Sequence, residues 1–373
     1  MIIAFDAKRA FHNRRGLGNY SRDVIRLMST YYPNVRQVLA GVPADKLMRI
    51  PANAQVIEPQ GLWRYAKGLW RSMGGMLKQL ERAQTTIYHG LSQELPYGIH
   101  RTKIRTAVTF HDALFMRYPE NYSTAYRKTF ELKNKYALDV ADCIIAITEQ
   151  SKRDAIEFFG ADKEKIFVVY QGCNNQFRMP VTEEQHKTIK IKYALPERYM
   201  LQVGAIEPNK NLQLILHAMS MLGAHCLPLL VIGGESAYAT KMLALANKLG
   251  IGDKLLLRHN VDFQDLPAFY HGAEVFLFPS RFEGFGIPVI EAQCCSVPVI
   301  TSRGGCFPET AGQGALFINP DDAADMAQAI KKILTDDGLR NDLICKGHEN
   351  TMRFTDDIVA HNLMATYQKI ESL

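Results

Sequence analysis

The feature that most constrains the fold is a regular alternation of short apolar runs with helical patterns. Buried strands are predicted at residues 2–5, 86–88, 106–110, 143–147 and 167–170. Short apolar runs bounded by turn residues are typical of strands in a parallel sheet, because such strands are buried on both faces. The alternation therefore predicts an α/β fold built on a doubly wound parallel sheet.

The same alternation restarts after a polar segment, residues 181–198, which we predict to be a linker that leaves room for a short helix. Six further strands are predicted at residues 199–203, 229–232, 254–257, 275–278, 298–301 and 315–318. Helices are predicted between them at residues 211–222, 237–249, 286–296 and 322–335. A length of 373 residues suits two domains. We therefore predict two Rossmann-like domains, 1–180 and 199–354, that face a central cleft. A last helix within residues 355–373 is expected to cross back to the N-terminal domain.

Cysteine usage and hydropathy exclude several classes of protein. The seven cysteines form no C-x-x-C pair, so neither a disulfide framework nor a zinc site is indicated and a reducing cytoplasm is expected. No apolar run approaches 18 residues, and the N-terminal run ends at Asp6, so neither a membrane-spanning helix nor a signal peptide is predicted. The sequence contains no D-x-D motif, and we expect no metal and no cofactor.

Charge is distributed unevenly along the chain. Residues 1–180 carry 27 Lys and Arg against 16 Asp and Glu, whereas residues 181–373 carry 17 against 22. A basic half joined to an acidic half suggests that the first half faces a polyanion, although uneven solvated charge would give the same pattern. We predict no nucleic-acid partner, because no recognised reader motif is present.

A glycine loop precedes the first long helical pattern. Gly16 and Gly18 would let the backbone approach a ligand closely, and the helix start would attract an anion. The dinucleotide fingerprint fails, because Ser21 stands where its third glycine is required. A phosphate or sugar loop is expected, with Arg14 and Arg15 as candidate cations; a plain tight turn with a solvated flap is the alternative.

A histidine and an aspartate, His111 and Asp112, close the strand at 106–110. Open α/β sheets bind ligands at the carboxyl ends of their strands, so a functional site is expected there. A lone histidine is often structural, and that alternative remains open.

The strongest signal lies in residues 279–292, where a strand ends, a glycine-rich loop follows and Pro288 suits the first turn of a helix. Glu283 lies in the loop and Glu291 about one turn into the helix, where carboxylates could accept hydrogen bonds from vicinal hydroxyls. Free backbone N–H groups are expected at the helix start, at Phe285, Gly286 and Ile287.

Five segments together resemble the GT4 family of retaining glycosyltransferases. They are residues 16–20, 203–211, 283–291, 297–301 and 308–312, and they occur in the family's order. The resemblance implies the GT-B fold, in which two Rossmann-like domains face a cleft. It also implies a nucleotide-sugar donor held mainly by the C-terminal domain and an acceptor held mainly by the N-terminal one.

The resemblance also assigns roles in the C-terminal domain. Lys210, after Gly204, would meet the donor diphosphate, and Glu291 would hold the ribose hydroxyls. Glu283 and the amides of the loop near Gly286 would contact the transferred sugar.

In the N-terminal domain, Gly16 and Gly18 would approach the diphosphate, and His111 would lie near the reacting sugar. Many family members have Arg where this chain has Ala205, so another cation is needed. The candidates are Arg14, Arg15 and Arg303.

The implied activity is transfer of a hexose, such as mannose or glucose, from a GDP- or UDP-sugar to a glycan or lipid-linked acceptor. The acceptor hydroxyl would attack on the face that the phosphate leaves, and a phosphate oxygen would take its proton. A nucleotide-sugar epimerase or a phosphorylase would share the two-domain cleft. Ala205 would also suit a degenerate, non-catalytic sugar-binding protein.

Residues 61–82 form an amphipathic pattern if taken as one helix. The apolar face would carry Trp63, Ala66, Trp70, Met73, Leu77 and Leu80, and the adjacent basic face Arg64, Lys67, Arg71, Lys78 and Arg82. Such a helix could lie on an anionic membrane, making the protein peripheral at the cytoplasmic membrane face. Packing of the apolar face on the N-terminal sheet is the alternative, and Gly74 and Gly75 weaken the helix.

Overall fold

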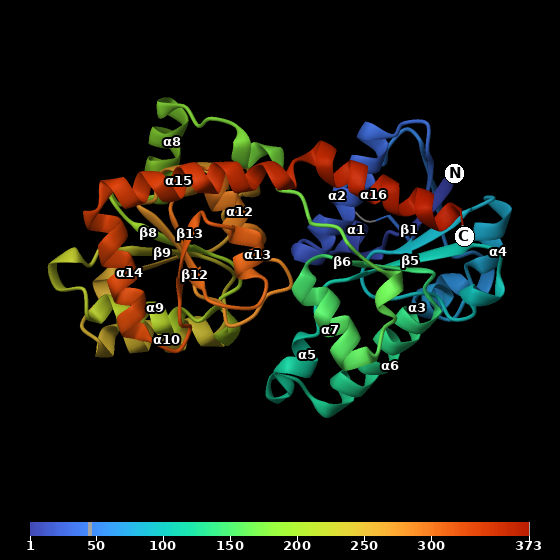
Figure 1. Cartoon of the computed structure of the whole chain (residues 1–373), viewed down its shortest axis with the longest axis horizontal. Coiled ribbons are helices and arrows are strands. Elements are labelled where there is room, and N and C mark those ends of the chain that lie inside the picture. Colours follow the sequence, from blue (N-terminus) through green and yellow to red (C-terminus); the bar gives the residue numbers. More distant parts are fainter. Residues whose placement is uncertain (44–46, 373) are drawn as a thin grey trace. The chain divides into compact units, whose positions relative to one another are not determined.

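The computed structural model describes residues 1–43 and 47–372. The chain forms two compact units: unit 1 contains residues 1–172 and 355–373, and unit 2 contains residues 173–354. Each unit is one parallel sheet with helices on both faces (Figure 1). The predicted class, two doubly wound α/β domains, is confirmed.

Unit 1 contains a seven-stranded sheet. Its strands, in spatial order, are β3 (Ala54–Ile57), β2 (Arg36–Ala40), β1 (Ile2–Asp6), β4 (Ile87–Gly90), β5 (Arg105–Phe110), β6 (Cys143–Ala146) and β7 (Ile166–Val168). Every neighbouring pair is parallel. The order reverses between β1 and β4, and doubly wound sheets bind ligands at such a switch point.

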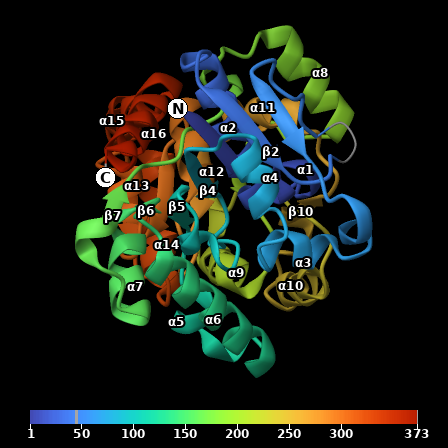
Figure 2. The same cartoon turned by 90° about the vertical axis from the view of Figure 1, so that its right-hand side faces the viewer.

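The helices of unit 1 lie on both faces of this sheet. They are α1 (Lys8–His12), α2 (Gly16–Tyr31), α3 (Lys67–Ser72), α4 (Leu77–Arg82), α5 (Leu114–Arg117), α6 (Thr124–Val140), α7 (Glu149–Phe159) and α16 (Asp356–Glu371). Helices α2 and α16 pack together on one face, and α6 and α7 cover the other (Figure 2).

The C-terminal helix α16 is fastened to unit 1 by polar contacts. The Tyr367 hydroxyl lies 2.7 Å from Nδ1 of His89 on β4, and both groups are buried. At its other end, Arg26 on α2 donates to the Asp356 carboxylate at 2.7 Å. These contacts, together with apolar packing, make α16 part of the first unit.

Unit 2 contains a six-stranded parallel sheet. Its strands, in spatial order, are β10 (Leu255–Arg258), β9 (Leu229–Ile232), β8 (Met200–Val203), β11 (Val275–Phe278), β12 (Val299–Ser302) and β13 (Ala315–Ile318). All six lie within one residue of their predicted bounds. The switch point lies between β8 and β11.

The helices of unit 2 also form two layers (Figure 1). They are α8 (Glu183–Tyr193), α9 (Leu212–Ser220), α10 (Ala237–Lys248), α11 (Leu266–His271), α12 (Ile287–Cys294), α13 (Phe307–Ala311), α14 (Ala323–Thr335) and α15 (Asp337–Thr351). Helices α9, α10 and α14 share one apolar core with the sheet, and α12 packs against α15.

Three sequence predictions differ from the structure. Strands β2 and β3 were not predicted, because polar residues interrupt their apolar runs. Unit 2 begins at Cys173 rather than after residue 198, and the short helix allowed for in residues 181–198 is present as α8, which a Thr182 capping box starts. Residues 61–82 form a 3₁₀ turn, η1 (Gly61–Tyr65), then α3 and α4, rather than one helix.

Within the described ranges, we find no helix that combines the length and the hydropathy needed to cross a bilayer.

Candidate functional site

Two loops meet at the switch point of unit 2, one after β8 and one after β11. The first carries Lys210 and the second Glu283, and Nζ of Lys210 lies 2.5 Å from Oε1 of Glu283. Both side chains are partly buried. The ammonium also lies 5.2 Å from the ring centroid of Phe278, the last residue of β11. The sheet therefore brings together two residues that are 73 positions apart in the chain.

Hydrogen bonds from two asparagines fix these loops to each other. Asn209 donates from its side chain to the Phe282 carbonyl at 2.7 Å, and its own carbonyl accepts from Arg281 N–H at 2.9 Å. Asn211 adopts a left-handed conformation with φ 58° and donates to the carbonyls of Pro279 and Pro320. Lys210 lies between these two clamps, so its backbone position is strongly determined.

The loop turns into α12 at Gly286. This residue has φ +93°, and a Cβ there would come within 3.3 Å of the Phe307 ring, so glycine is required. Pro288 lies in the first turn of α12, as predicted. Phe285 is buried against Phe354, and the helix start at Ile287 is partly exposed. Helix α12 thus begins beside the loop that carries Glu283.

Glu291 lies one turn into α12 and is almost fully buried. Its Oε2 accepts a hydrogen bond from the Tyr270 hydroxyl at 2.8 Å. Burial raises the pKa of this carboxyl to about 7, while the Tyr270 hydrogen bond acts in the opposite direction. The sequence analysis missed Tyr270, because it lies on α11 and nothing local connects it with α12.

Arg303, one of the candidate cations to replace the family arginine at Ala205, directly follows β12. Its guanidinium donates to the Phe317 carbonyl at 3.2 Å and lies 3.9 Å from Asp325, and its side chain is 67% exposed. Its contact with a phosphate stays a prediction. Gly204 has φ +144°, which favours glycine at this position, and a Cβ there would make an ordinary contact of 3.8 Å with Cε of Lys210. Lys210 itself lies at the switch point, paired with Glu283.

The switch point of unit 1 holds a buried ion cluster that the sequence analysis missed. Arg71 on α3 donates to Asp6 at the end of β1 at 2.7 Å and to Glu94, after β4, at 2.5 Å. Arg71 was expected on an exposed basic face and is buried instead. Burial lowers the pKa of its guanidinium, but the two carboxylates outweigh that effect and raise it. The cluster therefore joins α3 to two strand ends.

His111 is buried next to this switch point, with 4% of its surface exposed. Its Nε2 lies 2.9 Å from the Leu91 carbonyl, which can only accept, so Nε2 carries the proton. Burial lowers the pKa of the ring to about 4, so it is neutral at pH 7 and Nδ1 keeps a lone pair. The ring packs edge-on against Tyr20 of α2 at 4.8 Å between centroids. These contacts hold the histidine in one orientation.

Asp112 has a structural role in the fold. Its Oδ1 accepts from the Leu114 N–H at 2.9 Å, at the start of α5, and its carbonyl accepts from Gln93 at 2.8 Å. The prediction that it binds acceptor or phosphate stays a prediction.

The two glycines of the early loop differ in their surroundings. Gly16 is the first residue of α2, and a Cβ there would meet no atom within 4 Å, so the space above it is open. A Cβ on Gly18 would come within 1.8 Å of the Asn13 carbonyl oxygen, so this glycine is needed for packing. Arg14 and Arg15 are both exposed beside the start of α2. Gly16 and the two arginines therefore remain accessible to an anion.

This difference predicts opposite results for two alanine variants. Gly18→Ala should lower the free energy of unfolding by about 1–3 kcal/mol, because the backbone must shift to admit a methyl group. Gly16→Ala should leave it within about 0.5 kcal/mol of the wild type, because the added methyl group meets no atom. Urea unfolding measures the stability of both variants. Equal destabilisation by the two would contradict the conclusion that Gly18, and not Gly16, is needed for packing.

Among the described residues, no three His, Cys, Asp or Glu side chains gather as metal ligands would.

Solved structures with the same architecture define the class of protein. Sucrose-phosphate synthase from Thermosynechococcus elongatus matches with a TM-score of 0.82 and 20% identity, covering 100% of this chain and 99% of that one. Anabaena HepE in complex with UDP-glucose matches with a TM-score of 0.77 and 16% identity, covering 100% of both chains. At these identities the likeness shows the fold alone, which is the GT-B fold of glycosyltransferases.

Sequence comparisons give the family. The model of Glycosyltransferase Family 4 matches residues 43–177, and that of Glycosyl transferases group 1 matches residues 184–350. The chain therefore belongs to the GT4 glycosyltransferases, as the sequence motifs predicted.

Several curated proteins similar to this chain are mannosyltransferases. The O-antigen chain mannosyltransferase B of Escherichia coli is 28% identical over 273 residues, which is 72% of this chain and 70% of the relative. The O-antigen chain mannosyltransferase RfbU of Salmonella typhimurium is 31% identical over 228 residues, 61% of this chain and 60% of the relative. The chain spans only about a third of the length of another similar protein, the E. coli serotype-specific mannosyltransferase WbdA.

Proposed function

We propose that this glycosyltransferase is a retaining enzyme that moves a hexose from a GDP- or UDP-sugar to a glycan or lipid-linked acceptor in cell-surface polysaccharide or glycolipid synthesis. The observation that carries the proposal is the Lys210–Glu283 pair at the switch point of unit 2. Similarity to O-antigen mannosyltransferases favours mannose as the sugar. The likeness to a structure that contains UDP-glucose supports a nucleotide-sugar donor.

The donor would occupy the loops that carry Lys210 and Glu283. The ammonium of Lys210 would neutralise the diphosphate, and Glu283 would accept hydrogen bonds from hydroxyls of the sugar. In the structure these two groups pair with each other, which holds both side chains where a polar ligand would meet them. The start of α12 adds partial positive charge to the same place.

Bond breaking at the anomeric carbon places negative charge on the leaving diphosphate. Lys210 and the start of α12 would stabilise this charge, so no metal ion is required in the proposed reaction. The acceptor hydroxyl would attack from the face that the phosphate leaves, forming the new glycosidic bond as the old one breaks. A phosphate oxygen would take the hydroxyl proton. This step would retain the anomeric configuration without a protein nucleophile.

In this proposal Glu291 accepts hydrogen bonds from the ribose hydroxyls of the donor, so donor binding should depend on pH. The ionised carboxylate is the better acceptor, and its pKa is raised to about 7. Affinity for UDP-glucose or GDP-mannose should therefore fall as pH falls through 7 and be about tenfold weaker at pH 6 than at pH 8. Titration calorimetry of the wild type and Glu291→Gln checks this, since the variant should bind weakly at both values. A wild-type affinity that does not change with pH would contradict the role.

The proposal is tested with a panel of UDP- and GDP-sugars, with and without a lipid extract and with and without a chelator. Release of nucleoside diphosphate from one donor, increased by the extract and unaffected by the chelator, is the expected result. Release without any acceptor would instead indicate a hydrolase. Failure of every donor to bind in thermal-shift measurements would indicate a non-catalytic protein.

A further inference from the structure

An unusually apolar surface lies on η1 and α3 of unit 1. Leu62 is 87% exposed and Tyr65 is 92% exposed, and Trp63, Leu69 and Met73 are exposed as well. Single exposed apolar side chains are ordinary, but five within twelve consecutive residues are not. We call residues 62–73 the η1–α3 surface.

The local geometry aligns these side chains. Leu62 and Tyr65 are three residues apart in a 3₁₀ turn, so their side chains eclipse. Leu69 lies in α3, and Met73, four residues later, directly follows the end of this helix.

The inward-facing residues of this segment are fixed by contacts with the rest of unit 1. Trp70 is buried in the core of unit 1 together with Met76 and Leu80, and its indole N–H donates to Gln79 at 2.8 Å. Arg71 is fixed by its ion pairs with Asp6 and Glu94. The inward positions of the segment are therefore filled, and the exposed apolar side chains cannot turn inward.

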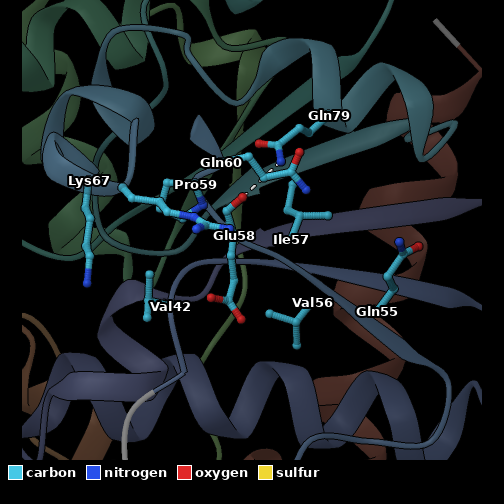
Figure 3. A pocket seen from close by; sticks show the side chains of 10 residues that line it. Val42, Gln55, Val56, Ile57, Glu58, Pro59, Gln60, Lys67 and Gln79 are labelled. Carbon is cyan, nitrogen blue, oxygen red and sulfur yellow. Dashed lines mark hydrogen bonds between the residues drawn. The ribbon is translucent and has the colours of Figure 1, made fainter. Parts of the chain in front are cut away.

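A pocket adjoins this surface at the carboxyl ends of β2 and β3. Its volume is about 660 Å³, and Arg64 and Lys67 of the η1–α3 surface line it together with Glu58 and Gln79 (Figure 3). Gln79 donates to the Glu58 carbonyl at 2.9 Å, which ties α4 to the end of β3. Two cations against one carboxylate give the pocket a net positive charge.

We propose that the η1–α3 surface docks on a membrane that carries anionic lipid headgroups. Leu62, Trp63 and Tyr65 would enter the headgroup region, while Arg64 and Lys67 bind lipid phosphates at the mouth of the pocket. Apolar and aromatic side chains beside cations are the combination that favours an interfacial position on an anionic bilayer. All of these residues belong to unit 1, so the proposal does not rest on the donor site in unit 2.

Co-sedimentation with vesicles tests the proposal. The full chain should bind phosphatidylcholine vesicles that contain phosphatidylglycerol, and should bind pure phosphatidylcholine vesicles much more weakly. The double variant Arg64→Gln and Lys67→Gln should bind the anionic vesicles about 30-fold more weakly, because each basic residue near such a surface contributes about fivefold. Glu58→Gln should strengthen this binding by about fivefold.

The apolar part is tested by Leu62→Ser with Tyr65→Ser. Both side chains are already in water, so folding should be unaffected, and binding to anionic vesicles should fall roughly tenfold. Matched controls are Leu132→Ser with Ile191→Ser, which are exposed elsewhere, and Lys331→Gln with Lys332→Gln, which remove the same charge from α14. These controls should bind as the wild type does.

Wild-type protein that stays in solution with anionic vesicles at low salt would overturn the proposal. So would equal binding by the Arg64 and Lys67 double variant and the wild type, or an equal loss in the α14 control.

Discussion

Replacing Lys210 by alanine is expected to lower the rate of sugar transfer by about 10²–10³-fold, the effect of removing one charge-stabilising group from an active site. Lys210 lies at the switch point of unit 2 beside Glu283, where its ammonium would stabilise the charge of the leaving diphosphate. A steady-state transfer assay with the preferred donor measures the loss.

The control for this variant is Lys241→Ala, which removes an exposed lysine of α10 in the same unit. It should transfer sugar at the wild-type rate. Glu283→Gln tests the carboxylate of the pair by itself, because it removes the carboxylate and leaves the Lys210 ammonium in place. If a folded Lys210→Ala protein kept full turnover, the proposed role of Lys210 in the active site would be contradicted.

Replacing Arg71 by alanine is expected to lower the free energy of unfolding by about 3–5 kcal/mol, since it leaves the buried carboxylate of Asp6 without its ion-pair partner. Asp6 is almost fully buried and cannot regain its hydration without structural change, whereas Glu94 keeps Lys133 at 3.4 Å. Chemical denaturation of the wild type and the variant measures the difference.

Arg64→Ala is the matched control, because Arg64 is an exposed arginine seven residues earlier in the chain. Its free energy of unfolding should stay within about 0.5 kcal/mol of the wild type. If Arg71→Ala were as stable as this control, the cluster would not be a structural element of unit 1.

Sequence reasoning located unit 2 well because each of its strands is a short apolar run followed by a turn. The loop after β11 could also be predicted, since Glu283, Gly286 and Pro288 lie within six residues and Glu291 lies in the next helix. Lys210 was assigned by its resemblance to the family lysine, and the structure adds that Glu283 is its ion-pair partner. That pairing depends on β8 and β11 being adjacent, which no local pattern specifies.

Unit 1 was harder to predict, and the errors have physical causes. Arg36 and Gln37 begin β2, and Gln55 lies in β3, so neither strand reads as an apolar run. The 61–82 pattern suggested one helix with a membrane face and a basic face. The backbone breaks near Ala66 and again near Gly74, which sends Trp70 and Arg71 into the protein and leaves Trp63 outside. The packing alternative is therefore correct for Trp70, whereas membrane contact of the exposed residues stays a proposal.

The central claim is that this chain transfers a hexose from a nucleotide sugar to an acceptor. The most direct measurement is mass spectrometry of a lipid extract incubated with the protein and the preferred donor. The account predicts a new product heavier by one hexose residue, formed by the wild type and almost absent with Lys210→Ala. Consumption of the donor with no hexose-bearing product would contradict the account.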